Sequence, residues 1–249
     1  MKSERMPGVG FVKYYLVPGT KKGRIRGNCR VRGRTLENEF LNVTVCSDST
    51  LLMRDKKRGT SFKTLHFFED GGDCAPQSGG YHFQAPAHDR IVSSLGSKPV
   101  VKVLARGPLV AALESSVTIH VPASGDTLRQ RRSKEAVPLR LRSVISLASQ
   151  EPWVTIDLFV ENRAADHRLR AVFPTGIATD TAYAQGHFHV MERSLTQKPW
   201  DTESMREFVF VTDGTKGFAL LSTGLHEYEA LKNGTLYLTL FRSNRYVTQ

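Results

Sequence analysis

The glycine-rich stretch between residues 70 and 83 carries the residues best suited to bind a ligand. Asp70 and Asp73 flank two glycines, and Gly79-Gly80 is followed by Tyr81. Glycine permits positive φ and lets a backbone approach a ligand closely. Two carboxylates and an aromatic ring on such a loop suit a sugar, because the acids can bond its hydroxyl groups while the ring packs on its apolar face. The alternative is an ordinary turn with solvated acids, since Gly-Asp clusters are common in turns.

Two histidines, His187 and His189, are spaced so that both rings lie on one face of a predicted strand. Such a pair can begin a metal site, but a site needs three or four ligands, and the other histidines and cysteines have no tight ligand spacing. We therefore favour half-buried or surface histidines. No Gly-x-Ser-x-Gly nucleophile motif occurs. The sequence leaves open which carboxylates converge for glycoside chemistry; the candidates are Glu37, Glu39, Asp70, Asp73, Asp157 and Glu161.

Positive charge is concentrated near the N-terminus. The chain has 249 residues and a formal charge of +11, and residues 21–34 hold seven basic residues and no acid, which leaves 11 − 7 = +4 elsewhere. Such a run can neutralise phosphates, but it has no aromatic ring for base stacking, so we expect a solvated loop and no nucleic-acid partner. No apolar run is long enough to span a membrane. The N-terminal residues lack the apolar core of a signal peptide. With an odd number of cysteines, three, these features predict a cytoplasmic protein without a membrane partner.

Short segments with period-two alternation dominate the chain. In residues 139–148, Leu139 and Ile145 fall on one face, while Arg140 and Arg142 fall on the other. No window sustains an apolar stripe of helical period. We expect an all-β fold, a large antiparallel sandwich of two packed sheets with little helix. The predicted strands are 9–17, 35–46, 50–54, 100–105, 109–121, 139–148, 154–162, 169–173, 187–191, 208–212, 217–222 and 235–241.

Several stretches, taken in order and at their spacing, resemble the C-terminal β-sandwich region of family 38 glycoside hydrolases, the α-mannosidases. They are TLENEFLNVTV (35–45), LHFFEDGGD (65–73), KVLARGPLVAAL (102–113), ENRAADHRLRAVFPTG (161–176), GFALLSTGLHEYEA (217–230) and LYLTLFRS (236–243). The similarity is greatest to the bacterial branch that includes mannosylglycerate hydrolase. It implies a galactose-mutarotase-like sandwich over residues 35–249, truncated at its C-terminus and preceded by an N-terminal strand and basic linker over 1–34.

The resemblance also implies what this chain contributes to a retaining α-mannosidase that acts on α-mannosides. In that family an N-terminal barrel carries the nucleophile, the acid/base and the zinc ligands. We therefore expect no catalytic residue, cofactor or metal site within these residues, and a barrel on a missing or separate part. By similarity, Tyr81, Asp70 and Asp73 are the candidate substrate-binding residues, although GDCAPQSGGYHFQAP departs from the bacterial pattern GDEYDYSP. His167 and Arg168 are expected to be structural, at the start of a strand.

Three other functions stay open at this point. A stand-alone carbohydrate-binding module would use Tyr81 with Trp153 and Trp200. A mutarotase-like sugar epimerase would pair a histidine at 187 or 189 with an acid such as Glu161 on a concave sheet face. Nucleic-acid binding through residues 21–34 would show steep salt dependence.

Overall fold

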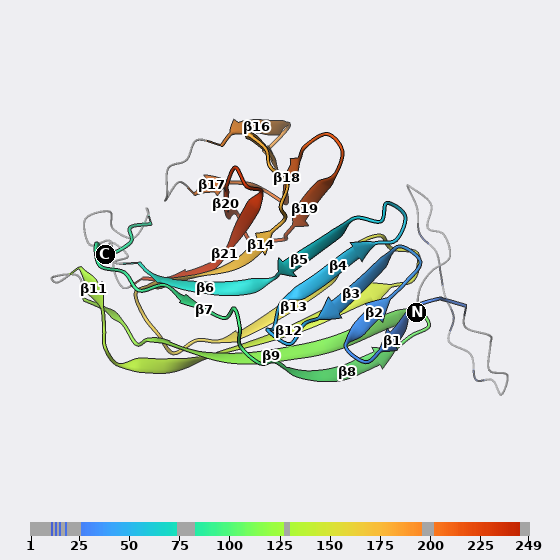
Figure 1. Ribbon diagram of the computed structural model, residues 1–249, viewed down its shortest axis with the longest axis horizontal. Coiled ribbons are helices and arrows are strands. Elements are labelled where there is room, and N and C mark those ends of the chain that lie inside the picture. Colours follow the sequence, from blue (N-terminus) through green and yellow to red (C-terminus); the bar gives the residue numbers. More distant parts are fainter. Residues whose placement is uncertain are drawn as a thin grey trace.

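The computed structural model describes residues 11, 13, 15, 18, 26–73, 83–126, 130–195 and 202–244. These residues form strands and turns without any helix (Figure 1), which confirms the all-β prediction. It follows that the described residues contain no helix that could cross a membrane. The strands form five hydrogen-bonded sheets, and every pair of strands within them is antiparallel.

The first sheet is a meander in which each strand pairs with the next along the chain. Its strands are β1 (Arg30–Arg32), β2 (Thr35–Glu37), β3 (Leu41–Val45), β4 (Leu51–Asp55) and β5 (Ser61–Leu65). Asn38 divides the strand predicted over 35–46, because its Oδ1 accepts the N–H groups of Phe40 (2.9 Å) and Leu41 (2.8 Å) in a tight turn. The expected linker boundary at 34/35 falls inside the β1–β2 hairpin, so β1 belongs to this sheet.

A four-stranded sheet in the order β13-β12-β9-β8 holds the longest strands. These are β8 (Val100–Arg106), β9 (Val110–Pro122), β12 (Ala136–Ala148) and β13 (Thr155–Glu161). The predicted alternation in β12 is confirmed: Leu139, Leu141, Ile145 and Leu147 are buried, and Arg140 is exposed. Alternation of this kind gives the sheet one buried and one solvated face.

A six-stranded sheet in the order β17-β20-β21-β14-β6-β7 positions the candidate site. Its members are β6 (Phe67–Gly72), β7 (Val92–Ser93), β14 (His167–Pro174), β17 (Glu203–Ser204), β20 (Glu227–Ala230) and β21 (Thr235–Ser243). The strand β14 is buried along nearly its whole length, because it lies between β6 and β21 and is covered on both faces. The remaining sheets are β16 (Val190–Ser194), β15 (Thr181–Gln185), β18 (Phe208–Thr212) and β19 (Gly217–Leu221), and the hairpin β10 (Gly125–Asp126) with β11 (Arg131–Arg132).

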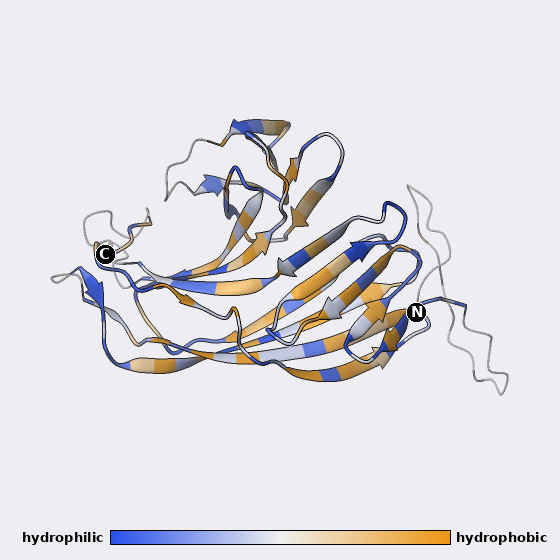
Figure 2. Cartoon of the chain, viewed as in Figure 1, coloured by the Kyte–Doolittle hydropathy of each residue, from blue (hydrophilic) through white to orange (hydrophobic). Residues whose placement is uncertain are grey.

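Four of the five sheets share one hydrophobic core. Its fully buried members come from four of the five sheets, for example Leu36, Leu113, Leu169 and Val209. In Figure 1 the long strands β8 and β9 form the lower side and the sheet of β15, β16, β18 and β19 projects at the top. Figure 2 shows hydrophobic and hydrophilic residues alternating along the long strands, as expected for strands that line this core.

Two predicted local structures are wrong. The acid-glycine stretch does not begin as a loop: Asp70 lies within β6, whose pairing with β14 continues to Gly72. The two histidines do not share a strand face, because β15 ends at Gln185 and β16 begins at Val190, and they occupy the turn between them. Tyr81, Trp200, Cys74 and most of the strand predicted over 9–17 lie outside the described residues. Of the other two cysteines, Cys29 is buried and Cys46 is partly buried.

Candidate functional site

Asp70 lies at the centre of a buried ion cluster. Its side chain is fully buried, and its carboxylate contacts Arg132 of β11 through one oxygen and His167 of β14 through the other. Arg132 is itself buried and also donates to the carbonyl oxygens of Asp70 (3.2 Å) and Arg90 (3.3 Å). These bonds hold β6 and β14 against the β10–β11 hairpin. His167 begins β14 and is fully buried, which agrees with the structural position expected for it.

The surroundings of His167 fix the orientation of its ring against the Asp70 carboxylate. The Nε2 atom of His167 lies 3.1 Å from Oδ1 of Asn162. Ala164 orients that amide, since its N–H donates to Oδ1 (2.9 Å) and its carbonyl accepts from Nδ2 (3.1 Å). Both ring nitrogens of His167 therefore lie beside side-chain oxygen atoms, one of Asp70 and one of Asn162. With Arg132 on its other side, Asp70 has no exposed surface from which to reach a sugar.

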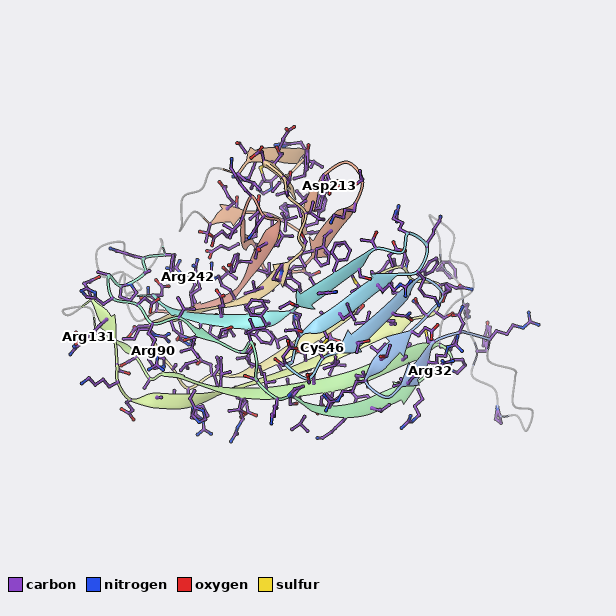
Figure 3. The ribbon with its side chains drawn as sticks, viewed as in Figure 1. Arg32, Cys46, Arg90, Arg131, Asp213 and Arg242 are labelled. Carbon is purple, nitrogen blue, oxygen red and sulfur yellow. The ribbon has the colours of Figure 1, made fainter. Side chains whose placement is uncertain are left out.

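Asp73 directly follows β6 and is also fully buried. Arg242 of β21, labelled in Figure 3, grips the carboxylate with Nε 2.7 Å from Oδ2 and Nη2 3.2 Å from Oδ1. The backbone N–H of Gln84 donates to the same Oδ1 at 3.4 Å. Because residues 74–82 lie between these partners in sequence, this contact ties together the two sides of the segment that contains Tyr81.

Arg168 fixes the downstream side of that segment. Its guanidinium carbon lies 3.4 Å from the centroid of the Phe83 ring, a stacking contact between a cation and an aromatic face. Burial, together with the neighbouring Arg170, lowers the pKa of Arg168 to about 10. Arg168 and Arg242 are cross-strand partners in the β14–β21 pair. Two adjacent arginines therefore hold Asp73 and Phe83, the two residues that bracket residues 74–82.

Arg170 continues the row of arginines along β14. Its Nη1 lies 2.6 Å from Oε2 of Glu229 on β20, and its Nη2 lies 3.2 Å from Oε2 of Glu69 on β6. The Tyr237 ring of β21 lies 4.2 Å from the guanidinium carbon. Burial raises the pKa of both Glu229 and Tyr237. We name the set of Arg168, Arg170 and Arg242 the arginine row.

Sequence reasoning missed most of the arginine row. It singled out Arg168 only, as a structural residue, although a signal for the remainder was present. Arg168-x-Arg170 and Glu227-x-Glu229 repeat every two residues with opposite charge, so each pair lies on one face of its own strand. The Oε1 atom of Glu227 lies 3.5 Å from Nη1 of Arg168, so the two faces meet.

The other candidate groups are not brought together. His187 bonds Arg206 through Nδ1 (2.9 Å) in the β15–β16 turn, whereas Glu161 ends β13 in a different sheet. Trp153 is exposed beside β13. Within the described ranges no group of three or more His, Cys, Asp or Glu side chains is placed to hold a metal ion. Sugar binding by Tyr81, Asp70 and Asp73 stays a prediction, and the geometry assigns the two acids to positioning the strands and the ends of residues 74–82.

Comparison with known proteins places this geometry in a family. The family described as "Glycosyl hydrolases family 38 C-terminal domain" matches residues 36–246. A protein of Halalkalibacterium halodurans, provisionally named a mannosylglycerate hydrolase, is 28% identical over 228 residues, covering 84% of this chain and 25% of that protein.

Two solved structures from Enterococcus faecalis are similar along most of the chain. An α-mannosidase from strain V583 superposes with a TM-score of 0.83 at 26% identity, covering 88% of this chain and 27% of that one. A family 38 glycosyl hydrolase superposes with a TM-score of 0.84 at 26% identity, covering 90% and 28%. The chain thus spans about a quarter of the length of these relatives. With 36–246 matched, the resemblance inferred from the sequence is confirmed, and the chain belongs to the C-terminal domain family of the family 38 glycosyl hydrolases.

Proposed function

We propose that this chain acts as the supporting β-sandwich of an α-mannosidase, and that its residues 74–82 contribute Tyr81 to the binding of a mannoside. In this proposal hydrolysis proceeds by two displacements through a covalent glycosyl intermediate. The reacting groups and the zinc ion belong to a barrel outside these 249 residues. Support comes from the family match and from relatives that are about four times as long.

The finer architecture is part of the same proposal. We interpret the β8-β9-β12-β13 sheet and the sheets that face it as the two layers of a galactose-mutarotase-like sandwich. The support is a single core cluster that contains Leu113 and Leu141 from one layer and Val43 and Leu169 from the other. Aligned sheets that share one core are the usual form of a sandwich.

The observation that carries the functional proposal is the double anchorage of residues 74–82. Asp73 is held by Arg242 at one end, and Phe83 is stacked on Arg168 at the other. Both arginines lie on neighbouring, hydrogen-bonded strands of the six-stranded sheet. A binding residue gains affinity when rigid elements hold its segment in place, because less ordering is needed on binding. This anchorage would serve an aromatic residue that packs against a sugar.

A titration followed by NMR tests the proposal. Mannose and mannosylglycerate are added to the chain, and we expect shifted resonances from Tyr81 at millimolar sugar. In the Tyr81→Ala variant, the sugar should no longer shift the resonances of any other residue in the chain. Phe188→Ala is the matched control, because Phe188 is a fully exposed aromatic in the β15–β16 turn. Absence of any shift at millimolar sugar, or equal loss in both variants, would count against the proposed role of Tyr81.

A further inference from the structure

A cleft of about 350 Å³ lies between two turns that belong to different sheets. Asp55 at the end of β4 lines the cleft, together with Arg58 and Thr60 of the turn from β4 to β5. The other turn connects β18 to β19 and supplies Thr215 and Lys216. Asp213, labelled in Figure 3, marks the second turn. A cavity of this size lies within the range of pockets that hold small molecules.

One aromatic side chain contributes an apolar surface to the cleft. Phe62 on β5 lines it and is almost completely buried. Its ring packs edge-to-face on Phe218 of β19, with the ring centroids 5.1 Å apart. This contact fixes the two turns relative to each other, because it joins the strands from which they project.

Both nearby carboxylates are already used by their own turns. Oδ1 of Asp55 accepts the N–H groups of Lys57 (2.8 Å) and Arg58 (3.0 Å), which together with the Arg58 guanidinium lower the pKa of Asp55. Asp213 accepts from the Thr215 hydroxyl (2.6 Å) and the Lys216 N–H (3.0 Å), and these bonds lower its pKa to about 2. Both acids are therefore ionised at neutral pH, and Oδ1 of each is occupied.

The side chains with unused hydrogen-bonding capacity are mainly donors. Arg58 gives one guanidinium nitrogen to Asp55 at 3.3 Å and is largely exposed. The ammonium group of Lys216 lies 3.4 Å from the carbonyl oxygen of Gly176, its one hydrogen bond among the residues that the structure describes. Thr60 lines the cleft, and its hydroxyl makes no hydrogen bond to any of the residues that the structure describes. A guanidinium and an ammonium carry five and three donors, so most of them remain available.

We propose that this cleft binds a small oxyanion, a phosphate or carboxylate group carried by a molecule of about sugar size. Arg58 and Lys216 approach the anion from opposite turns, and the Thr60 hydroxyl donates a third hydrogen bond. Arginine suits a planar or tetrahedral oxyanion because its donors form a fork, whereas lysine contributes a point charge. The Phe62 ring below them excludes water from one side of the ligand.

NMR titration of the 249-residue chain with inorganic phosphate tests the site. We expect the amide resonances of residues 58–62 and 212–217 to shift with a dissociation constant of about 1 mM. Acetate, glucose 6-phosphate and glucose then distinguish the sources of the anion. If acetate binds and the phosphate compounds do not, the cleft is a carboxylate site. If glucose 6-phosphate binds more tightly than phosphate, it is a phosphosugar site. Equal shifts with neutral glucose would overturn the proposal.

Substitutions separate this site from general attraction to a basic chain. The Arg58→Gln, Lys216→Gln double variant should lose about tenfold or more in phosphate affinity, and Lys216→Arg should retain it. The matched control is Arg140→Gln with Lys102→Gln, which removes the same charge from two exposed side chains that each contact one carboxylate. Equal loss in both double variants, or no shifted amide at tens of millimolar phosphate, would show that the cleft is not an anion site. Circular dichroism checks that each variant is folded.

Discussion

Replacement of Asp70 by alanine tests whether the buried ion cluster supports the fold. The side chains of Asp70 and His167 are 0% exposed and that of Arg132 is 2% exposed. Removing Asp70 leaves the buried Arg132 cation without its carboxylate partner and the buried His167 ring without one of its hydrogen-bond partners, and the loss of a buried ion-pair partner costs about 3–5 kcal/mol at comparable sites. Because a domain is stabilised by about 5–15 kcal/mol in total, Asp70→Ala should lose a large share of its stability.

Urea unfolding followed by circular dichroism measures this loss. The control is Glu161→Gln, which breaks an ion pair with Arg140 whose side chains are 66% and 56% exposed and should cost about 0–1 kcal/mol. A second arm replaces the whole cluster by apolar residues, Asp70→Leu with Arg132→Met and His167→Leu. It should recover most of the loss, since no unpaired charge remains. If Asp70→Ala lost no more free energy of unfolding than Glu161→Gln, the assignment of Asp70 to the fold would be refuted.

Three further predictions concern stability. Burial lowers the pKa of His66 from 6.5 to about 4, so as the pH falls the unfolded chain binds the proton before the folded chain does. The contribution of His66 to the free energy of unfolding is therefore complete above pH 6.5 and falls by up to about 3 kcal/mol as the pH drops toward 4. His66→Asn, which tolerates the φ of 60° found there, should flatten that slope in urea unfolding at several pH values; an unchanged slope would contradict the assignment. Gly234→Ala should lower the melting temperature far more than Gly59→Ala, because both have positive φ but only at Gly234 would the new Cβ lie 2.2 Å from the Ile177 carbonyl oxygen; equal shifts would refute this packing. Arg242→Lys keeps the charge but loses the two-point grip on Asp73, so the free energy of unfolding should fall by about 1–2 kcal/mol, and no change would count against the anchorage.

The strands with simple alternation were predictable from the sequence. The predicted 208–212 coincides with β18, and the predictions for β9, β12 and β13 differ from the structure by a few residues at the ends. These strands have one face in the core, so the local pattern of apolar residues determines them. By contrast, β5 and β6 are among the strands that the pattern did not predict. The sequence of β6, FFEDGG, has no alternation, because Asp70 is buried by partners 62 and 97 residues away.

The candidate site was predictable only in part. The glycine-rich pattern and then the resemblance directed attention to Asp70 and Asp73, but their burial depends on Arg132, His167 and Arg242, which come from strands distant in sequence. No local pattern encodes such partners. The histidine pair was mispredicted for a local reason. Gly186 directly follows β15, and its N–H donates to the carbonyl of His189 at 2.8 Å, so a tight turn replaces the expected strand.

The most direct test of the central claim is an activity assay of the purified 249-residue chain with an aryl α-mannoside and added zinc. If these residues form a supporting sandwich whose acids hold strands and the ends of a binding segment, the rate of release of the aryl group will equal the rate in buffer. Mannoside release above that rate, lost on substitution of a residue within the chain, would contradict the claim that the reacting groups lie outside it.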